Sequence, residues 1–155
     1  MKRTIKELLI ALAIPLAVGG LAALLSGGMK DFQTMNQPPL SPPGWLFPIV
    51  WTILYLLMGY ASYRVYTAEA DQGAKRRALI LYAIQLLLNL LWPILFFRFH
   101  LYLTAFFLLV ILWVFIYLTI RAFSAIDERA GDLLLLYILW VTFAGYLNLG
   151  VFLLN

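Results

Sequence analysis

The side chains of this sequence that could do chemistry are indoles, phenols and carboxamides, and they recur at helical spacing in three apolar stretches. Residues three or four apart lie on the same face of an α-helix. A carboxamide in an apolar medium is costly unless it is hydrogen-bonded, so each face is expected to point into a protein interior. Such faces would line a mostly apolar pocket with few polar groups, which is typical of small-molecule sites. The three stripes are Trp51, Tyr55 and Gly59; Gln85, Asn89, Trp92 and Phe96; and Tyr137, Trp140, Ala144 and Asn148.

Less specific interpretations of the same residues remain open from the sequence. Tryptophan and tyrosine are enriched at membrane interfaces, so Trp51, Trp92 and Trp140 could belong to an aromatic belt or to core packing instead of a pocket. Gln85 and Asn89 could hydrogen-bond between helices, contact a ligand, or do both. The aromatic residues expected at the interface or against lipid are Trp45, Tyr66, Tyr102 and Trp113.

Conventional enzyme chemistry finds little support in the sequence. The chain contains no cysteine, which excludes disulfides, thiolate metal sites and a cysteine nucleophile. The single histidine, His100, has no second metal-ligating residue nearby, so no metal site is expected. No nucleophile lies in a pattern with a general base. Hydrolytic or acid–base catalysis is therefore the least supported class of function.

The elements that must position these stripes are membrane-spanning helices. Of the 155 residues, 65% are hydrophobic and only 12% are charged, far from the usual composition of soluble domains. Five uncharged runs each approach the roughly 20 residues that an α-helix needs to cross a bilayer. The sequence predicts an all-α integral membrane bundle of five helices, forming one domain over residues 1–155. The expected spans are residues 6–26, 45–66, 77–97, 101–123 and 132–154.

The charged residues predict how the chain sits in the membrane. The formal net charge is +4, but the basic residues lie between apolar runs, which argues against nucleic-acid binding. Nine of them lie near the N-terminus or in and directly beside the second and fourth connections, against two, Lys30 and Arg98, in the first and third. By the positive-inside rule, this multi-pass protein of the cell membrane has a cytoplasmic N-terminus and an external C-terminus.

The long connection at residues 27–44 is rich in proline and precedes the second span directly. Proline fixes φ and removes a backbone donor, so this segment is expected to be a stiff, extended loop that covers a cavity. The first span carries Gly19, Ala23 and Gly27 at four-residue spacing, which allows close helix packing. That packing could be within the bundle or in a homodimer.

Three motifs in this order resemble the translocator protein family, also known as tryptophan-rich sensory proteins (TspO) or peripheral benzodiazepine receptors. The similarity covers most of the chain. Departures from the family pattern include Leu40 and Asp31-Phe32, where tryptophan or tryptophan-tyrosine is frequent, and Leu136, where proline is frequent. The matching motifs are Gln37 to Phe47 with Val50-Trp51, Leu54-Tyr55 and Met58-Gly59; Gln85-Leu86, Asn89, Trp92 and Phe96-Phe97; and Tyr137, Trp140, Phe143-Ala144 and Leu147-Asn148.

The resemblance implies a receptor for protoporphyrin-type tetrapyrroles and for synthetic isoquinoline and benzodiazepine ligands. Animal members of the family also bind sterols. The porphyrin would be a ligand or substrate, and no resident cofactor is implied. Trp51 and Trp140 would be electron donors in a light-dependent oxidative degradation of protoporphyrin. The expected ligand-binding residues are Phe32, Pro42, Trp51, Tyr55, Gln85, Asn89, Trp92, Phe96, Trp140, Phe143, Ala144, Leu147 and Asn148.

Two other functions stay open at this point. The first is passive transport of tetrapyrroles or lipids, because the uncharged runs contain no ionisable relay for a coupled pump. The second is a non-catalytic stress sensor that acts through partner proteins. Whichever function holds, membrane lipid is an expected partner.

Overall fold

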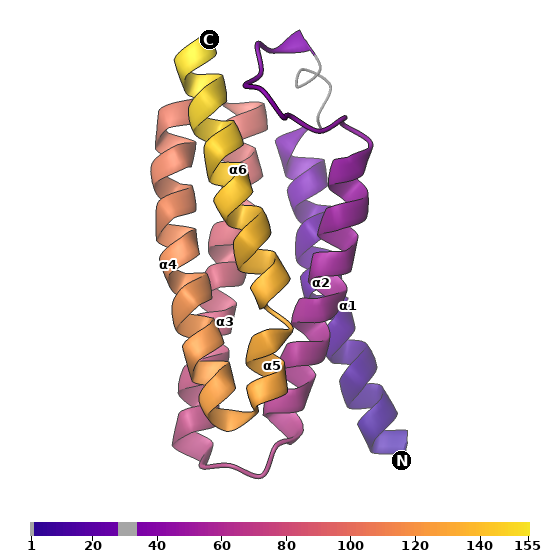
Figure 1. Cartoon of the computed structure of the whole chain (residues 1–155). Helices are drawn as coiled ribbons and strands as arrows, with labels where there is room; N and C mark the ends of the chain where they lie inside the picture. The colour runs from indigo at the N-terminus through magenta and orange to yellow at the C-terminus, as the bar shows by residue number, and fades with distance from the viewer. Residues whose placement is uncertain (1, 28–33) are drawn as a thin grey trace.

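A computed structural model describes residues 2–27 and 34–155 of the chain. In this described part, five long apolar helical segments could each cross a membrane, which confirms the predicted all-α membrane fold. Figure 1 shows the long helices running roughly along one direction. The elements are α1 (Lys2–Ser26), α2 (Leu46–Thr67), α3 (Gln72–Pro93), the π-helical turn η2 (Ile94–Arg98), α4 (Tyr102–Ile126), α5 (Glu128–Asp132) and α6 (Leu135–Leu154).

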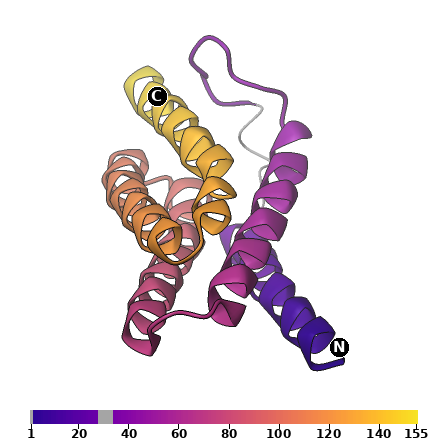
Figure 2. The same cartoon turned by 60° about the horizontal axis from the view of Figure 1, so that its bottom comes forward.

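The helices do not pack simply in chain order. α1 packs against both α2 and α3, α3 packs against α4, and α4 packs against α6. α2 and α3 are joined by a short connection, yet they make little direct contact because α1 lies between them (Figure 2). This arrangement brings α1 into the neighbourhood of the Trp51 and Asn89 stripes, which sequence spacing alone does not indicate.

The third span is longer than predicted and changes its winding near its end. It begins at Gln72, where the Asp71 carboxylate accepts a hydrogen bond from the Ala74 backbone N–H at 3.0 Å. Proline cannot donate to the helix ladder, and the regular α-helix ends at Pro93. The wider turn that follows has a bond from the Phe99 N–H to the Ile94 carbonyl at 3.2 Å. Pro93 thus marks the change from α-helical to π-helical winding.

The fifth span is interrupted, where the sequence predicts one continuous helix over 132–154. The short α5 is capped by Asp127, whose carboxylate accepts a hydrogen bond from the Arg129 N–H at 3.1 Å. Asp127 also forms an ion pair with Arg64, whose Nε–H donates a hydrogen bond to the Asp127 carboxylate at 2.7 Å. The hydrogen bond from Arg64 lowers the pKa of the Asp127 carboxyl. A turn at residues 133–134 then leads into α6. The cap and the ion pair tie this connection to the end of α2.

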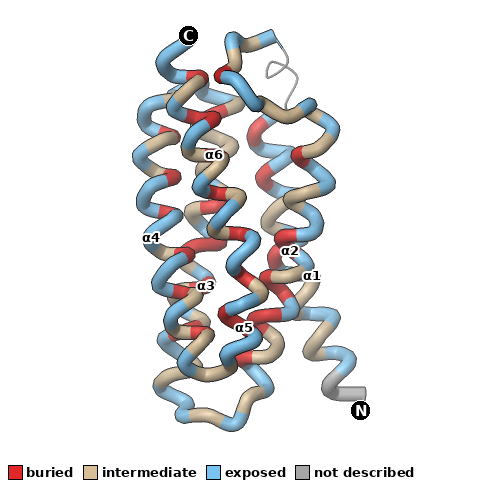
Figure 3. The backbone as a smooth tube through the Cα atoms, in the orientation of Figure 1, coloured by how far each residue is buried: buried red, intermediate tan, exposed pale blue. Residues whose placement is uncertain are grey.

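The outer surface of the bundle carries many large apolar side chains. Figure 3 shows buried positions facing the inside of the bundle, while exposed positions follow the outer sides of the helices. Exposed residues include Leu87, Phe107 and Leu139, each more than half accessible. Large apolar side chains on every outward face are what a lipid environment stabilises. The structure therefore describes a multi-pass membrane protein; which terminus faces the cytoplasm stays a prediction.

A close helix crossing between α1 and α2 depends on Gly59. A Cβ at this position would lie 2.7 Å from the Ala11 carbonyl oxygen and 2.8 Å from the Leu12 Cα. Both are backbone atoms, so the helices would have to separate. We expect Gly59→Ala to destabilise the protein by about 1–3 kcal/mol, the usual cost of overpacking.

Thermal unfolding in detergent, followed by tryptophan fluorescence, checks this expectation. Gly20→Ala is the matched control on α1, because a Cβ there meets no atom within 4 Å. A Gly59→Ala variant as stable as Gly20→Ala would show that α1 and α2 do not cross at this point.

Candidate ligand-binding site

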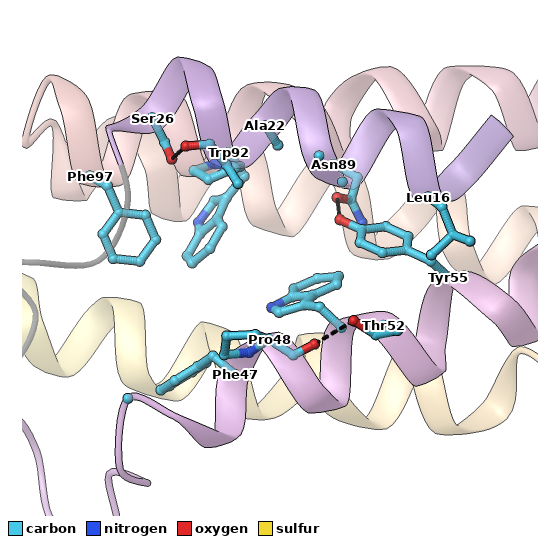
Figure 4. Close-up of a pocket in the computed structure, with 16 residues that line it drawn as sticks. Leu16, Ala22, Ser26, Phe47, Pro48, Thr52, Tyr55, Asn89, Trp92 and Phe97 are labelled. Carbon is cyan, nitrogen blue, oxygen red and sulfur yellow. Dashed lines mark hydrogen bonds between the residues drawn. The ribbon is translucent and has the colours of Figure 1, made fainter. Parts of the chain in front are cut away.

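A cavity of about 570 Å³ lies between α1, α2 and α3. Its volume is within the roughly 300–1,000 Å³ range of small-molecule sites. In Figure 4 the side chains of Trp92 and Phe97 point across the space toward Phe47 and Pro48. The lining residues are Leu16, Gly19, Gly20, Ala22, Ala23, Ser26, Gly44, Phe47, Pro48, Trp51, Thr52, Tyr55, Asn89, Trp92, Pro93 and Phe97.

The α1 wall of this cavity consists mainly of small residues. Gly19 and Ala23, two members of the predicted small-residue stripe, both line the space. Gly19 also faces the ring of Tyr55, so a side chain there would overlap that ring. Within the described residues, the stripe thus leaves room beside the α2 aromatics. Its third member, Gly27, does not line the cavity.

The polar groups beside the cavity form a chain of hydrogen bonds across three helices. The Tyr55 hydroxyl donates to Asn89 Oδ1 at 2.9 Å. Asn89 Nδ2 donates to the Tyr137 hydroxyl at 2.8 Å, and that hydroxyl donates to Gln85 Oε1 at 2.7 Å. All four residues are buried. The carboxamides are therefore satisfied by side chains of other helices, and the chain joins α2, α3 and α6.

A second, much smaller cavity of about 40 Å³ lies next to the first, on the α6 side. The two cavities share Phe47, Trp51, Trp92 and Phe97, so these four aromatic residues form a partition between them. The Phe47 and Trp140 rings meet edge to face with centroids 5.7 Å apart. The remaining residues of the smaller cavity are Phe96, Trp140, Ala144, Leu147 and Asn148.

The partition is held in place by ring packing and by one hydrogen bond. Trp51 stacks on Tyr55 with ring centroids 5.6 Å apart, and Trp92 stacks on Phe96 at 5.2 Å. The Trp92 indole N–H donates to Asn148 Oδ1 at 2.9 Å, while Asn148 Nδ2 donates to the Tyr102 carbonyl at 2.8 Å. The fully buried Asn148 thus fixes the orientation of Trp92.

Trp140 is held differently from Trp92. Its indole nitrogen is buried and has no hydrogen-bond partner among the described residues. The ring lies between the smaller cavity and an outer apolar groove that also contains Val50, Ile53, Leu136, Leu139 and Phe143. A donor without a partner is available to a ligand that offers an acceptor.

The structure divides the predicted site residues into separate groups. Gln85 lies behind Asn89 in the hydrogen-bond chain, Phe143 lies on the outer groove, and Pro42 lines neither cavity. Phe32 lies outside the described residues. Of the predicted residues, the larger cavity is lined by Trp51, Tyr55, Asn89 and Trp92, and the smaller one by Trp51, Trp92, Phe96, Trp140, Ala144, Leu147 and Asn148. That these residues bind a ligand stays a prediction.

The sequence predicts one hollow between the second, third and fifth spans, but the larger cavity is bounded by the first, second and third spans. Leu16, Gly20, Ala22 and Ser26 of α1 were not predicted as lining residues. The sequence signal was the Gly19 and Ala23 spacing, which is equally compatible with close helix packing. Only the placement of α1 between α2 and α3 distinguishes a cavity wall from a simple packing contact.

The described part of the proline-rich loop is docked on the end of α6. The Tyr146 hydroxyl donates to the Pro39 carbonyl at 2.6 Å, and the Asn155 Nδ2 donates to the Asn36 carbonyl at 2.8 Å. Pro38 is buried against Gly150, where a Cβ would overlap its ring. Figure 1 shows the loop beside the C-terminal end of the bundle. Its last residue before Trp45, Gly44, reaches the larger cavity.

Comparison with known proteins agrees with this architecture. The profile of the TspO/MBR family matches residues 11–154. The chain belongs to this family. The sequence is 37% identical over 157 residues to the tryptophan-rich protein TspO of Chlorobaculum tepidum, covering 100% of this chain and 99% of that one. The resemblance inferred from the three motifs is thereby confirmed.

Other TspO/MBR relatives come from different kingdoms. The tryptophan-rich sensory protein of Cereibacter sphaeroides is 38% identical over 124 residues, covering 80% of this chain and 76% of the relative. The translocator protein of Bos taurus is 34% identical over 124 residues, covering 78% and 72%. The family assignment therefore rests on most of the chain.

The hydrogen bonds of Asn148 generate a stability prediction for this family member. Asn148→Ala leaves the Trp92 N–H and the Tyr102 carbonyl without their partner. We expect a loss of about 1–3 kcal/mol, the usual cost of an unsatisfied buried polar group. Denaturant unfolding in detergent measures it.

Thr142→Val is the matched control for this prediction. Thr142 also accepts an indole N–H, that of Trp113 at 2.9 Å, but on the exposed surface. The expected loss is much smaller there. Equal losses for the two variants would contradict the view that Asn148 is an internal tie.

Proposed function

We propose that this membrane protein binds a flat tetrapyrrole of the protoporphyrin type in the cavity between α1, α2 and α3. The observation that carries the proposal is a cavity of about 570 Å³ with indole and phenyl rings on one side and the mainly small residues of α1 on the other. Flat aromatic ligands stack favourably on such rings in offset or edge-to-face geometry. The same walls suit the smaller isoquinoline and benzodiazepine ligands implied by the family resemblance.

The polar groups of the cavity are few and lie close together. Asn89 and Tyr55 line the α2–α3 side, and their hydrogen bond is already formed. Each amide nitrogen carries two donor hydrogens and each carbonyl oxygen two acceptor sites. The pair therefore retains capacity to orient the polar edge of a ligand. Thr52 lines the same space, although its hydroxyl donates to the Pro48 carbonyl at 2.7 Å.

The proposal includes light-dependent breakdown of the bound porphyrin. An indole next to an excited porphyrin can transfer an electron to it, and dissolved dioxygen is the oxidant for the breakdown. Trp51 would contact the ligand directly because it lines the cavity. Trp140 lies on the other side of the aromatic partition and contacts Phe47. The porphyrin is thus a substrate, and the proposal requires no resident cofactor.

Illumination of the purified protein with protoporphyrin tests this function. We expect Trp51→Phe combined with Trp140→Phe to reduce both the quenching of tryptophan fluorescence by ligand and the rate of bleaching, the latter at least fivefold. The matched control is Trp113→Phe, because Trp113 is exposed on α4, away from both cavities. Unchanged quenching and bleaching in the double variant would overturn the proposal.

Passive carriage of the ligand is the second candidate, and one feature of the cavity favours it. Gly20 lines the cavity, is exposed, and has open space where a side chain would be. Ala23 on α1 and Thr52 on α2 also line the space and are exposed. The cavity thus reaches the lipid-facing surface between α1 and α2, and a lipid-soluble ligand could pass there.

Gly20→Leu tests this lateral opening without altering any aromatic residue. The added side chain would occupy the opening, so we expect ligand association to slow at least fivefold and any protein-dependent flux through liposomes to fall equally. Gly20→Ala is the size control, and thermal unfolding checks that both variants fold. Binding without flux in the unaltered protein would exclude the carrier function. Unchanged association in Gly20→Leu would place the opening elsewhere.

A further inference from the structure

A separate groove of about 510 Å³ lies at the opposite end of the bundle from the candidate ligand-binding site. It is formed where α2 ends and α3 begins, with α1 as the third wall. The candidate cavity uses α2 residues up to Tyr55, whereas the groove begins only at Tyr66. The lining residues are Glu7, Tyr66, Thr67, Gln72, Lys75, Arg76 and Leu79.

Two cationic side chains dominate the groove. The Lys75 ammonium donates to the Tyr66 carbonyl at 3.0 Å, which holds it at the end of α2. Among the described residues, Arg76 has no hydrogen bond and no ion pair, and Lys75 has no acidic partner within 4 Å. Glu7 is the acidic residue of the lining, while the neighbouring Asp71 carboxylate caps α3. Positive charge therefore remains available to an anion.

The groove lies at the boundary between polar and apolar surface. Tyr66, an aromatic residue of the type enriched at membrane interfaces, is exposed beside the two cations. Leu79 lines the side toward the span, and the next residue, Ile80, is 51% exposed on the outer surface. An anionic group bound here would thus have apolar surface directly beside it. Basic pockets between helices at this depth recognise acidic lipid headgroups.

We propose that this groove binds the phosphate headgroup of an anionic membrane lipid. Lys75 and Arg76 contact the phosphate, Gln72 offers a further donor, and the acyl chains follow the apolar surface from Leu79 to Ile80. A soluble phosphate would use the same cations but gains nothing from that apolar surface. The inference does not depend on the proposed tetrapyrrole function, because it concerns different residues at the other end of the helices.

Native mass spectrometry of the detergent-purified protein tests the proposal with phosphatidylglycerol as the probe and phosphatidylcholine as the neutral reference. We expect the protein to retain phosphatidylglycerol preferentially. Each basic residue near the headgroup strengthens binding about fivefold, so Lys75→Gln combined with Arg76→Gln should weaken it at least tenfold. The matched control is Arg77→Gln, which removes a neighbouring exposed charge that does not line the groove.

The outcomes separate the possible sources of binding. Loss in the double variant with retention in Arg77→Gln supports the proposal. Equal losses in both variants, or no preference for phosphatidylglycerol in the unaltered protein, would overturn it in favour of diffuse charge. Competition by glycerol phosphate at concentrations comparable to the lipid would assign the groove to a soluble anion instead. If the double variant does not fold, Gln72→Glu places a negative charge in the groove with both cations intact, and undiminished lipid retention there would equally overturn the proposal.

Discussion

The structure depends on a buried chain of hydrogen bonds that joins Tyr55, Asn89, Tyr137 and Gln85. In hydrocarbon, an unsatisfied polar group costs several kcal/mol, so these side chains must find one another when the helices associate. Each bond contributes modestly, on average about 0.6 kcal/mol in membrane proteins. Their geometric effect is larger, because they specify how α2, α3 and α6 are rotated toward each other.

This rotation determines where the aromatic side chains lie. With Tyr55 bonded to Asn89, Trp51 is stacked on the Tyr55 ring and lines both cavities together with Trp92 of α3. Asn148 then fixes the Trp92 indole from α6. The aromatic partition is thus built from the same helices as the polar chain, and α1 contributes mainly small residues opposite it. The cavity is the space that this combination leaves unfilled.

Much of this architecture follows from the sequence, because bilayer thickness and helical periodicity are strong constraints. The five spans follow from uncharged runs, and burial of Gln85, Asn89 and Asn148 follows from the cost of amides in hydrocarbon. The break before α6 was not predicted, because residues 133–134 are leucines in an apolar run and are neither proline nor glycine. The α1 wall was missed because helix order around the bundle is not encoded in spacing within one helix.

A structure of the protein with protoporphyrin bound tests whether the space between α1, α2 and α3 receives the ligand. We expect ligand density against the Trp51 and Trp92 rings, with the small residues of α1 on the opposite side. Density confined to the outer groove between Val50 and Phe143, or to the smaller cavity beside Ala144, would contradict it.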